Sequence, residues 1–219
     1  MIQQFIVKSG AKTLRVFFAG WGSDDNLFGG FRPEGMDYLL CYDYRSLSFD
    51  YSLFEGYERV EVVAWSFGVW VAGVVLGAEE ARGLNIVRSV AMDGTLSPID
   101  ETRGIPPSIF EGTLSGFSPS GLVKFRRRMC GGSEGVKEFL ALCPRRGLEE
   151  LREELEALGM AVQSESERSK FQFSEVVISS ADNIIPTANQ LEAWKEHKDV
   201  RVVEGYHFSI AIFDEYLRA

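Results

Sequence analysis

A serine between two apolar runs is the residue of this sequence best placed to act as a nucleophile. Residues 60–64 lead directly through Trp65-Ser66-Phe67-Gly68 into a second apolar run at 69–76. This spacing predicts a strand, a sharp turn that holds Ser66, and a helix. Serine attacks a carbonyl when it projects from such a turn, beside a base and N–H groups that receive the oxyanion. The usual motif G-x-S-x-G begins here with Ala64, whose methyl group is small enough for strand and helix to approach closely.

Two histidines could act as the base. His207 follows the last predicted strand through Glu204-Gly205-Tyr206, a loop position that presents a histidine at the carboxyl edge of a sheet. His197 lies on the polar side of a predicted helix, and we expect it at the surface. We therefore predict that His207 takes the proton from Ser66.

A carboxylate must hold the histidine tautomer and stabilise the imidazolium. Asp182 follows the penultimate predicted strand and precedes a helix that begins near Pro186. It completes the chain order Ser, Asp, His that goes with a strand–serine–helix turn. Asp93 is the alternative acid, because it follows the strand after the serine helix, where some hydrolases place this residue. We favour Asp182 as the acid. If Asp93 is not the acid, it is a turn residue before Gly94.

Two backbone N–H groups are needed to bind an oxyanion. Phe67, directly after the serine, supplies the first. The second is expected from Trp21, in the loop Ala19-Gly20-Trp21-Gly22 after the second predicted strand, because the glycines let the chain bend. The alternative is a surface turn in which Trp21 only packs.

Seven segments have the apolar patterns of strands, and most of them alternate with helical patterns or long connections. That alternation predicts a largely parallel sheet in a single α/β domain over residues 1–219. The segment 9–12, with Gly10, predicts a hairpin between the first two strands. The strands are predicted at 4–8, 13–19, 38–42, 59–64, 86–92, 175–179 and 200–203.

The strand pattern stops between Met92 and Phe173, and helical patterns occupy part of the gap. We place an inserted helical lid at 100–170, since such an insertion covers the carboxyl ends of the strands, where ligands bind. Helices are predicted within the lid at 121–129, 133–142 and 148–158, and outside it at 69–82, 186–198 and 208–217.

Composition indicates a soluble cytoplasmic protein. Of 219 residues, 45% are hydrophobic, yet no apolar run is long enough to span a membrane and the start lacks a secretory signal. Cys41, Cys130 and Cys143 are odd in number and have no metal-binding spacing, so we expect neither a disulfide framework nor a zinc site. The net charge of −9 disfavours binding to nucleic acid or an anionic membrane.

The charge is unevenly distributed along the chain. Residues 120–148 contain seven basic and two acidic residues, a local net charge of +5, while the remainder carries −14. A basic surface on an acidic protein favours a specific acidic partner, whereas the alternative is a solvated helical face that binds nothing. The basic residues are Lys124, Arg126, Arg127, Arg128, Lys137, Arg145 and Arg146.

Several motifs of this sequence occur together in one known family. They are spread along nearly the whole chain, and the resemblance is weakest in the lid. They are Phe18-Ala19-Gly20-Trp21-Gly22, Tyr42-Asp43-Tyr44-Arg45, Ala64-Trp65-Ser66-Phe67-Gly68-Val69-Trp70, Asp93-Gly94-Thr95, Gly104-Ile105-Pro106, Asp182-Asn183-Ile184-Ile185-Pro186 with Asn189-Gln190 and Trp194, and Gly205-Tyr206-His207. Together they resemble the BioG family of α/β-hydrolases, which are pimeloyl-[acyl-carrier protein] methyl ester esterases of bacterial biotin synthesis.

The resemblance implies a triad of Ser66, Asp182 and His207, with Trp21 in the oxyanion loop. The family more often has asparagine where Asp93 stands, which counts against Asp93 as a shared acid. The resemblance also implies that lid arginines hold the acyl-carrier protein, in agreement with the basic segment. We assign this contact to Lys124, Arg126, Arg127, Arg128, Arg145 and Arg146.

We therefore predict an α/β-hydrolase fold with a mostly parallel seven-stranded sheet and a helical lid. The predicted activity is that of a serine esterase acting on pimeloyl-[acyl-carrier protein] methyl ester, as a monomer without metal or organic cofactor. Alternatives are a carboxylesterase or acyl thioesterase of other specificity, and a non-catalytic binding module with this fold. The acyl chain is expected against Phe117, Leu122, Phe125 and Phe139.

Overall fold

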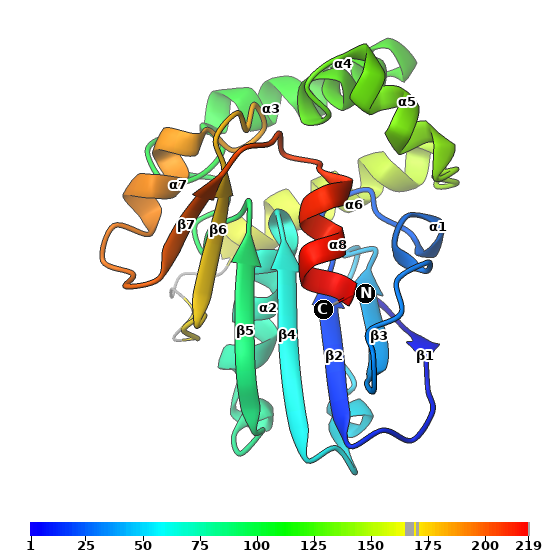
Figure 1. Cartoon of the computed structure of the whole chain (residues 1–219). Coiled ribbons are helices and arrows are strands. Elements are labelled where there is room, and N and C mark those ends of the chain that lie inside the picture. The colour runs from blue at the N-terminus through cyan, green and yellow to red at the C-terminus, as the bar shows by residue number, and fades with distance from the viewer. Residues whose placement is uncertain (165–168, 170, 219) are drawn as a thin grey trace.

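Seven strands form one sheet in the computed structural model of the chain, which describes residues 1–164, 169 and 171–218 (Figure 1). The strand order is β1-β3-β2-β4-β5-β6-β7, and every neighbouring pair is parallel except β1 and β3. The predicted strands are confirmed to within two residues at each end. They are β1 Ile2–Val7, β2 Thr13–Phe18, β3 Asp37–Tyr42, β4 Arg59–Trp65, β5 Ile86–Met92, β6 Glu175–Ser179 and β7 Val200–Val203.

The predicted hairpin between the first two strands is wrong. Strand β1 instead runs antiparallel to β3 at the edge of the sheet, with Ile2 opposite Tyr42. The carboxylate of Asp37, at the start of β3, accepts hydrogen bonds from Ser9 N at 2.6 Å and from Gly10 N at 3.3 Å. This contact holds the turn after β1 against β3, so the chain crosses to the far side of β3 before β2 begins.

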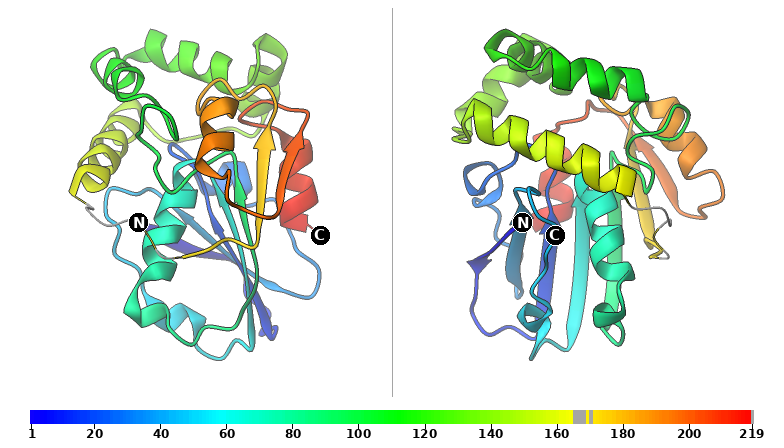
Figure 2. Two further views of the ribbon diagram at one scale, coloured as in Figure 1. Left: turned by 90° about the vertical axis from the view of Figure 1, so that its left-hand side faces the viewer. Right: turned by 180° about the vertical axis from the view of Figure 1, so that it is seen from behind.

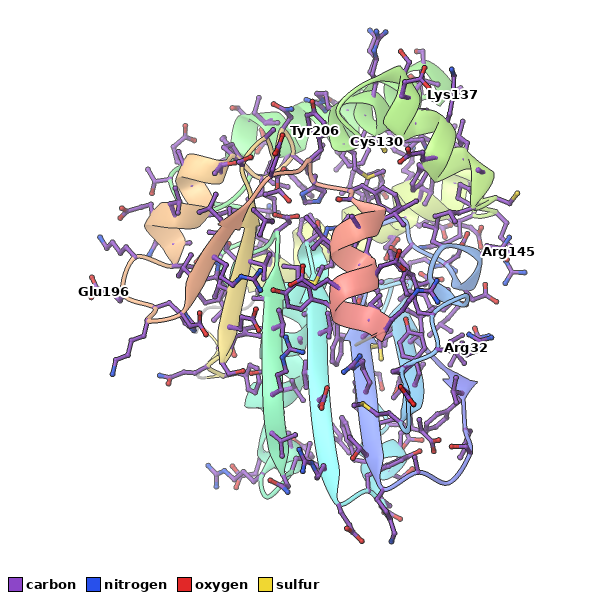
Figure 3. The ribbon with its side chains drawn as sticks, in the orientation of Figure 1. Arg32, Cys130, Lys137, Arg145, Glu196 and Tyr206 are labelled. Atoms are coloured by element: carbon purple, nitrogen blue, oxygen red, sulfur yellow. The ribbon has the colours of Figure 1, made fainter. Side chains whose placement is uncertain are left out.

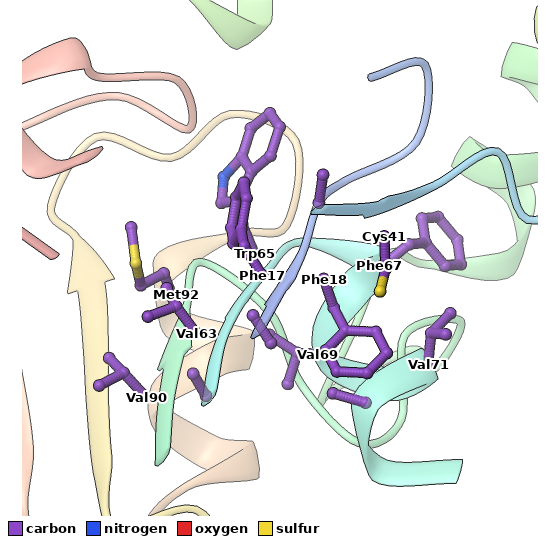
Figure 4. Close-up of a cluster of buried hydrophobic side chains, with 14 of the residues drawn as sticks. Phe17, Phe18, Cys41, Val63, Trp65, Phe67, Val69, Val71, Val90 and Met92 are labelled. Carbon is purple, nitrogen blue, oxygen red and sulfur yellow. The ribbon is translucent and has the colours of Figure 1, made fainter. Parts of the chain in front are cut away.

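Helices cover both faces of the central strands. Helix α8 (Ile210–Arg218) lies in front of the sheet in Figure 1 and α2 (Phe67–Gly77) behind it, as the rear view in Figure 2 also shows. Because successive side chains of a strand point to opposite faces, Phe17 packs toward α8, with its ring 6.2 Å from that of Phe213, whereas Phe18 packs toward α2 (Figure 4). The central strands therefore have apolar side chains on both faces.

Four helices between β5 and β6 cross the carboxyl ends of the strands (Figures 1 and 2). We call them the cap. They lie within the predicted lid, whose residues 165–168 and 170 are outside the described part of the chain. None of the helices in the described ranges is both long and apolar enough to cross a membrane. The cap consists of α3 Pro107–Ser115, α4 Pro119–Met129, α5 Ser133–Ala141 and α6 Leu148–Ser164.

Two short helices were not predicted, and several predicted helix ends differ from the structure. α1 (Asp25–Phe28) is a single turn, too short for a periodic pattern, and α3 contains Gly112, which weakens its apolar pattern. Helix α2 ends at Gly77 because Ala78 is extended, with ψ 158°. α7 spans only Thr187–Ala193.

Candidate active site

Ser66 occupies a strained turn between β4 and α2. Its φ is +59° and its ψ is −129°, a combination that costs about 1–3 kcal/mol for a residue with a side chain. The next turn of chain passes close to the end of β2: a Cβ added to Gly68 would lie 2.1 Å from Phe18 O and 2.5 Å from Ala19 O. Glycine at position 68 is therefore required for α2 to begin directly after the serine.

The hydroxyl of Ser66 meets His207, and His207 meets Asp182. The distance from Ser66 Oγ to His207 Nε2 is 2.9 Å, and that from His207 Nδ1 to Asp182 Oδ2 is 2.7 Å. All three residues are buried, and they follow β4, β7 and β6 at the carboxyl edge of the sheet. This geometry allows the histidine to take a proton from the serine while a carboxylate faces its other nitrogen.

Hydrogen bonds hold the Asp182 carboxylate in place. Its Oδ1 accepts from Ile184 N at 2.8 Å and Ile185 N at 3.0 Å, and its Oδ2 also accepts from Gln190 Nε2 at 2.8 Å. Sequence reasoning assigned no role to Gln190. The available signal is a polar side chain on the buried face of the helix that follows Asp182.

Asp93 lies close by but is held differently. Its Oδ1 accepts from Ser179 N at 2.6 Å and its Oδ2 from Ser179 Oγ at 2.7 Å. Both oxygens are thus directed at the end of β6, while the imidazole is bonded to Asp182. Burial and the nearby charge of Asp182 raise the pKa of Asp93.

The environment of His207 shifts its affinity for a proton. Burial by itself lowers the pKa of His207, but the charge and hydrogen bond of Asp182, together with the charge of Asp93, outweigh burial and raise it above the ordinary value. Trp65 also supports this residue, because its indole Nε1 donates to His207 O at 2.9 Å. The residue before the serine therefore fixes the loop that carries the base.

The other histidine lies away from this cluster. His197 was expected at the surface, but it is half-buried, and its Nε2 lies 2.8 Å from Phe173 O. Its ring also packs at 5.7 Å from Trp194, so the turn after α7 encloses it.

Trp21 and Phe67 line the cavity that contains Ser66 and His207. Neither backbone N–H donates a hydrogen bond to another residue in the described ranges. The Trp21 indole is fixed by the cap: its Nε1 donates to Leu151 O at 2.8 Å, and its ring meets that of Phe125 edge-on at 4.9 Å.

The cavity beside Ser66 is mainly apolar, and cap residues form much of its wall. Of the four predicted pocket residues, Phe125 lines it, whereas Leu122 and Phe139 line a smaller cavity that Trp21 also lines, and Phe117 lines an outer groove. Contact of these three residues with an acyl chain stays a prediction. Lining residues missed by the sequence reasoning are Trp65, Ile105, Ile109, Phe110, Thr113, Met129, Leu155, Asn183 and Ile184.

A groove across α3 and α4 adjoins this cavity. Residues common to both linings include Ile109, Phe125 and Arg128. The groove is also lined by Lys124 and Arg127, which are exposed on α4. A chain that enters along the groove therefore passes basic side chains before it reaches the serine.

The remaining basic residues of the cap have different surroundings. Lys137 and Arg145 point outward from its periphery (Figure 3), and each is paired with an acid, Glu134 and Asp25 respectively. Half-buried Arg126 lies over the Phe139 ring, 5.3 Å from its centre.

Arg146 does not belong to an exposed basic surface. Its side chain is only 7% exposed and lies 2.5 Å from Glu154 and 3.1 Å from Asp43. A guanidinium enclosed by two carboxylates presents no charge to a partner, so we remove Arg146 from the predicted carrier-protein contact.

Comparisons with known proteins agree with this architecture. A family model described as "Pimeloyl-ACP methyl esterase BioG" matches residues 1–218. The crystal structure of BioG from Haemophilus influenzae superposes with a TM-score of 0.89 at 34% identity, over 100% of both chains. An esterase from Exiguobacterium antarcticum, with a TM-score of 0.67 at 14% identity over 98% of this chain and 91% of that one, shares the fold. The predicted α/β-hydrolase fold is confirmed.

Two curated proteins are also similar. An uncharacterised protein of Haemophilus influenzae is 35% identical over 204 residues, which are 93% of this chain and 92% of that protein. A protein of Bacteroides fragilis named malonyl-[acyl-carrier protein] O-methyltransferase is 44% identical over 207 residues, or 94% of this chain. The match spans only 41% of that longer protein.

Proposed function

The chain belongs to the BioG family, and from this premise we propose that it is a serine esterase that hydrolyses the methyl ester of pimeloyl-[acyl-carrier protein] in biotin biosynthesis. The observation that carries the proposal is the hydrogen-bonded chain from Ser66 through His207 to Asp182, with contacts of 2.9 and 2.7 Å beside an apolar cavity. The name of the Bacteroides relative is consistent with it, because O-methylation of a carrier-bound acid makes the kind of ester that this reaction removes.

In the proposed mechanism, Ser66 Oγ attacks the ester carbonyl while His207 Nε2 takes the hydroxyl proton. The N–H groups of Trp21 and Phe67 receive the resulting oxyanion. His207 then gives its proton to the departing methoxide, which leaves as methanol, and an acyl-serine remains. A water molecule, deprotonated by His207, attacks this acyl group, and the free carboxylate leaves as Ser66 recovers its proton.

The position of the ester sets the direction of the substrate. The methyl ester stands at one end of the pimeloyl chain and the carrier at the other, so an ester at Ser66 leaves the carrier outside. The aliphatic chain would contact apolar walls such as Phe110, Met129 and Leu155. The groove with Lys124 and Arg127 would then face the acidic carrier and its phosphate-bearing arm.

Hydrolysis of purified pimeloyl-[acyl-carrier protein] methyl ester tests the proposal. We expect release of methanol and a carrier that still bears the acyl chain, now as the free acid. Release of the free carrier thiol would instead identify an acyl thioesterase. If a fluorophosphonate failed to label Ser66 and neither product formed, the chain would be a non-catalytic module with this fold.

Charge reversal on α4 should selectively weaken the use of the carrier-bound substrate. In Lys124→Glu/Arg127→Glu, we expect KM for the carrier-bound ester to rise by up to about tenfold, because exposed ion pairs contribute about 1 kcal/mol or less each and steer association. Salt should weaken the wild type on this substrate in the same way, since exposed charges are screened over about 8 Å at physiological ionic strength. Steady-state kinetics with the carrier-bound ester and with a small ester, p-nitrophenyl acetate, provide the measurement.

The matched control is Arg59→Glu/Arg82→Glu, which reverses two exposed charges at the opposite end of the sheet. It should leave both activities unchanged. An equal loss of activity toward carrier-bound and small esters in the α4 variant would mean that these residues support the cap rather than bind the carrier.

The pH dependence should reflect the raised pKa of His207. The neutral imidazole is the base, so kcat/KM for p-nitrophenyl acetate should fall as pH decreases through a midpoint above 6.5. Asp93→Asn removes a negative charge that favours the imidazolium, and the midpoint should move to lower pH. An unchanged or higher midpoint in Asp93→Asn would contradict this assignment of the charge effect.

A further inference from the structure

Helix α6 of the cap carries a fully buried glutamate that the proposed mechanism does not use. Glu154 is 0% exposed. Its Oε2 accepts from Gly22 N at 3.0 Å and from Arg146 Nη1 at 2.5 Å, and its Oε1 accepts from Tyr44 N at 2.8 Å. Burial, the largest influence, raises the pKa of Glu154, while Arg146 and the two N–H groups favour its charged form.

These contacts converge on the loop that contains Trp21. Gly22 is the next residue along the chain, with a φ of +78°. Leu151, one turn before Glu154 on the same face of α6, accepts from the Trp21 indole through its carbonyl oxygen. Helix α6 therefore holds both the side chain of Trp21, a residue that lines the serine cavity, and the peptide group that follows Trp21.

Tyr44 closes the network at the beginning of the same loop. Its backbone N–H is bound by Glu154, and its hydroxyl donates to Ala19 O at 2.7 Å. The loop from Ala19 to Gly22 is thus held at one end by the Tyr44 hydroxyl and at the other by the Glu154 carboxylate.

Burying an ion pair costs free energy because both charges lose their hydration. An apolar side chain of similar volume would pack as well or better, but it could not accept hydrogen bonds from two backbone N–H groups. Arg146, enclosed by Glu154 and Asp43, supplies the positive charge that a buried carboxylate requires. The contacts of this cluster are therefore suited to fixing a backbone geometry.

We propose that Glu154 is a positioning residue for the oxyanion hole: by binding Gly22 N, its carboxylate directs the neighbouring Trp21 N–H toward the carbonyl oxygen of the ester bound at Ser66. The inference rests on the proposed esterase activity and deepens it. Because Glu154 belongs to the cap, the hole is complete only while α6 is docked on the Ala19–Gly22 loop.

Glu154→Gln tests this role, because it keeps the side-chain volume but removes the charge and one acceptor. With p-nitrophenyl acetate we expect kcat to fall by about ten- to a hundredfold, less than the loss of an entire oxyanion donor, with KM little changed. A boronic acid that forms a tetrahedral adduct with Ser66 should bind more weakly by a similar factor. The acid midpoint of the pH profile should not move, because the His207–Asp182 pair is intact.

The matched control is Glu153→Gln, on the same helix. Glu153 is half exposed and pairs with Arg45 at 2.8 Å, away from the loop. This variant should keep wild-type kcat and wild-type boronate affinity. Far-UV circular dichroism and thermal melting establish that each variant is folded.

A second variant covers the case in which Glu154→Gln does not fold. Tyr44→Phe removes only the hydroxyl that holds Ala19 O. It should lower kcat and boronate affinity together, by a smaller factor than the one expected for Glu154→Gln. A folded Glu154→Gln protein with unchanged kcat, or with reduced kcat but unchanged boronate affinity, would overturn the inference. If Glu154→Gln does not fold, an unaffected Tyr44→Phe protein would overturn it. An inert wild-type protein would overturn the proposed function itself.

Discussion

Replacement of Ser66 by alanine should lower kcat for p-nitrophenyl acetate by about 10³-fold or more, and His207→Ala should cost a similar factor. The double variant should be little worse than either single one, because the serine is a poor nucleophile without its base and the base has no nucleophile to activate without the serine. The 2.9 Å contact between Ser66 Oγ and His207 Nε2 is the physical basis for this unit. Single-turnover and steady-state rates of the three variants provide the measurement.

The other histidine is the natural control for this experiment. His197 lies against Phe173 O, outside the serine cavity, so His197→Ala should retain turnover close to that of the wild type. Labelling by a fluorophosphonate should disappear in Ser66→Ala and persist in His197→Ala. Near-normal turnover in Ser66→Ala or His207→Ala would contradict the assignment of Ser66 as the nucleophile and His207 as the base.

Asp182→Asn should preserve the fold yet lower kcat by about 10²- to 10⁴-fold. The carboxylate accepts from His207 Nδ1 at 2.7 Å and therefore selects the tautomer whose Nε2 can take a proton. An asparagine amide can present its NH₂ group to that nitrogen and favour the other tautomer. Kinetics at a pH where the wild-type imidazole is neutral separate this loss from a shift in the pH profile.

Asp93→Asn is the matched comparison, since it changes a second buried carboxylate at the same edge of the sheet. Its oxygens are bonded to Ser179 rather than to the imidazole, so the loss in kcat should be below about tenfold. If Asp93→Asn proved severe and Asp182→Asn mild, the acid would have to be reassigned to Asp93.

The two buried carboxylates beneath the imidazole have distinct surroundings. Asp182 receives two backbone N–H groups and the Gln190 amide, which stabilise a negative charge next to a forming imidazolium. Asp93 stands at a strained φ of +45° and secures the end of β6, from which the Asp182 loop departs. A role for Asp93 in supporting Asp182 is therefore compatible with the smaller loss expected on its replacement.

Local sequence patterns were sufficient to predict the strands and the cluster at their carboxyl edge. Ser66, Asp182 and His207 each follow a strand, and parallel strands end at the same edge, so three distant residues could be assigned to one place. The strained turn at Ser66 was readable because Ala64 and Gly68 are the small residues that a direct strand-to-helix junction needs. These features depend on spacing along the chain.

The pairing of β1 with β3, the walls of the cavity and the surroundings of Arg146 depend on tertiary contacts instead. The turn at residues 9–12 suits a hairpin, but the Asp37 carboxylate holds it against β3. Leu155 reaches the cavity only because α6 docks on the sheet edge.

Arg146 illustrates the physical reason most clearly. In the sequence it is one of seven basic residues within 120–148, and nothing in that pattern distinguishes an exposed guanidinium from a buried one. Its carboxylate partners are Glu154 in the next helix and Asp43 far away after β3. Periodicity reports which side of a helix is apolar, but the charges that a side chain meets are decided by the packing of distant segments. Sequence alone thus determined the strand ends and the three residues that follow them, whereas the folded chain decided which charges are exposed and which hold the Trp21 loop.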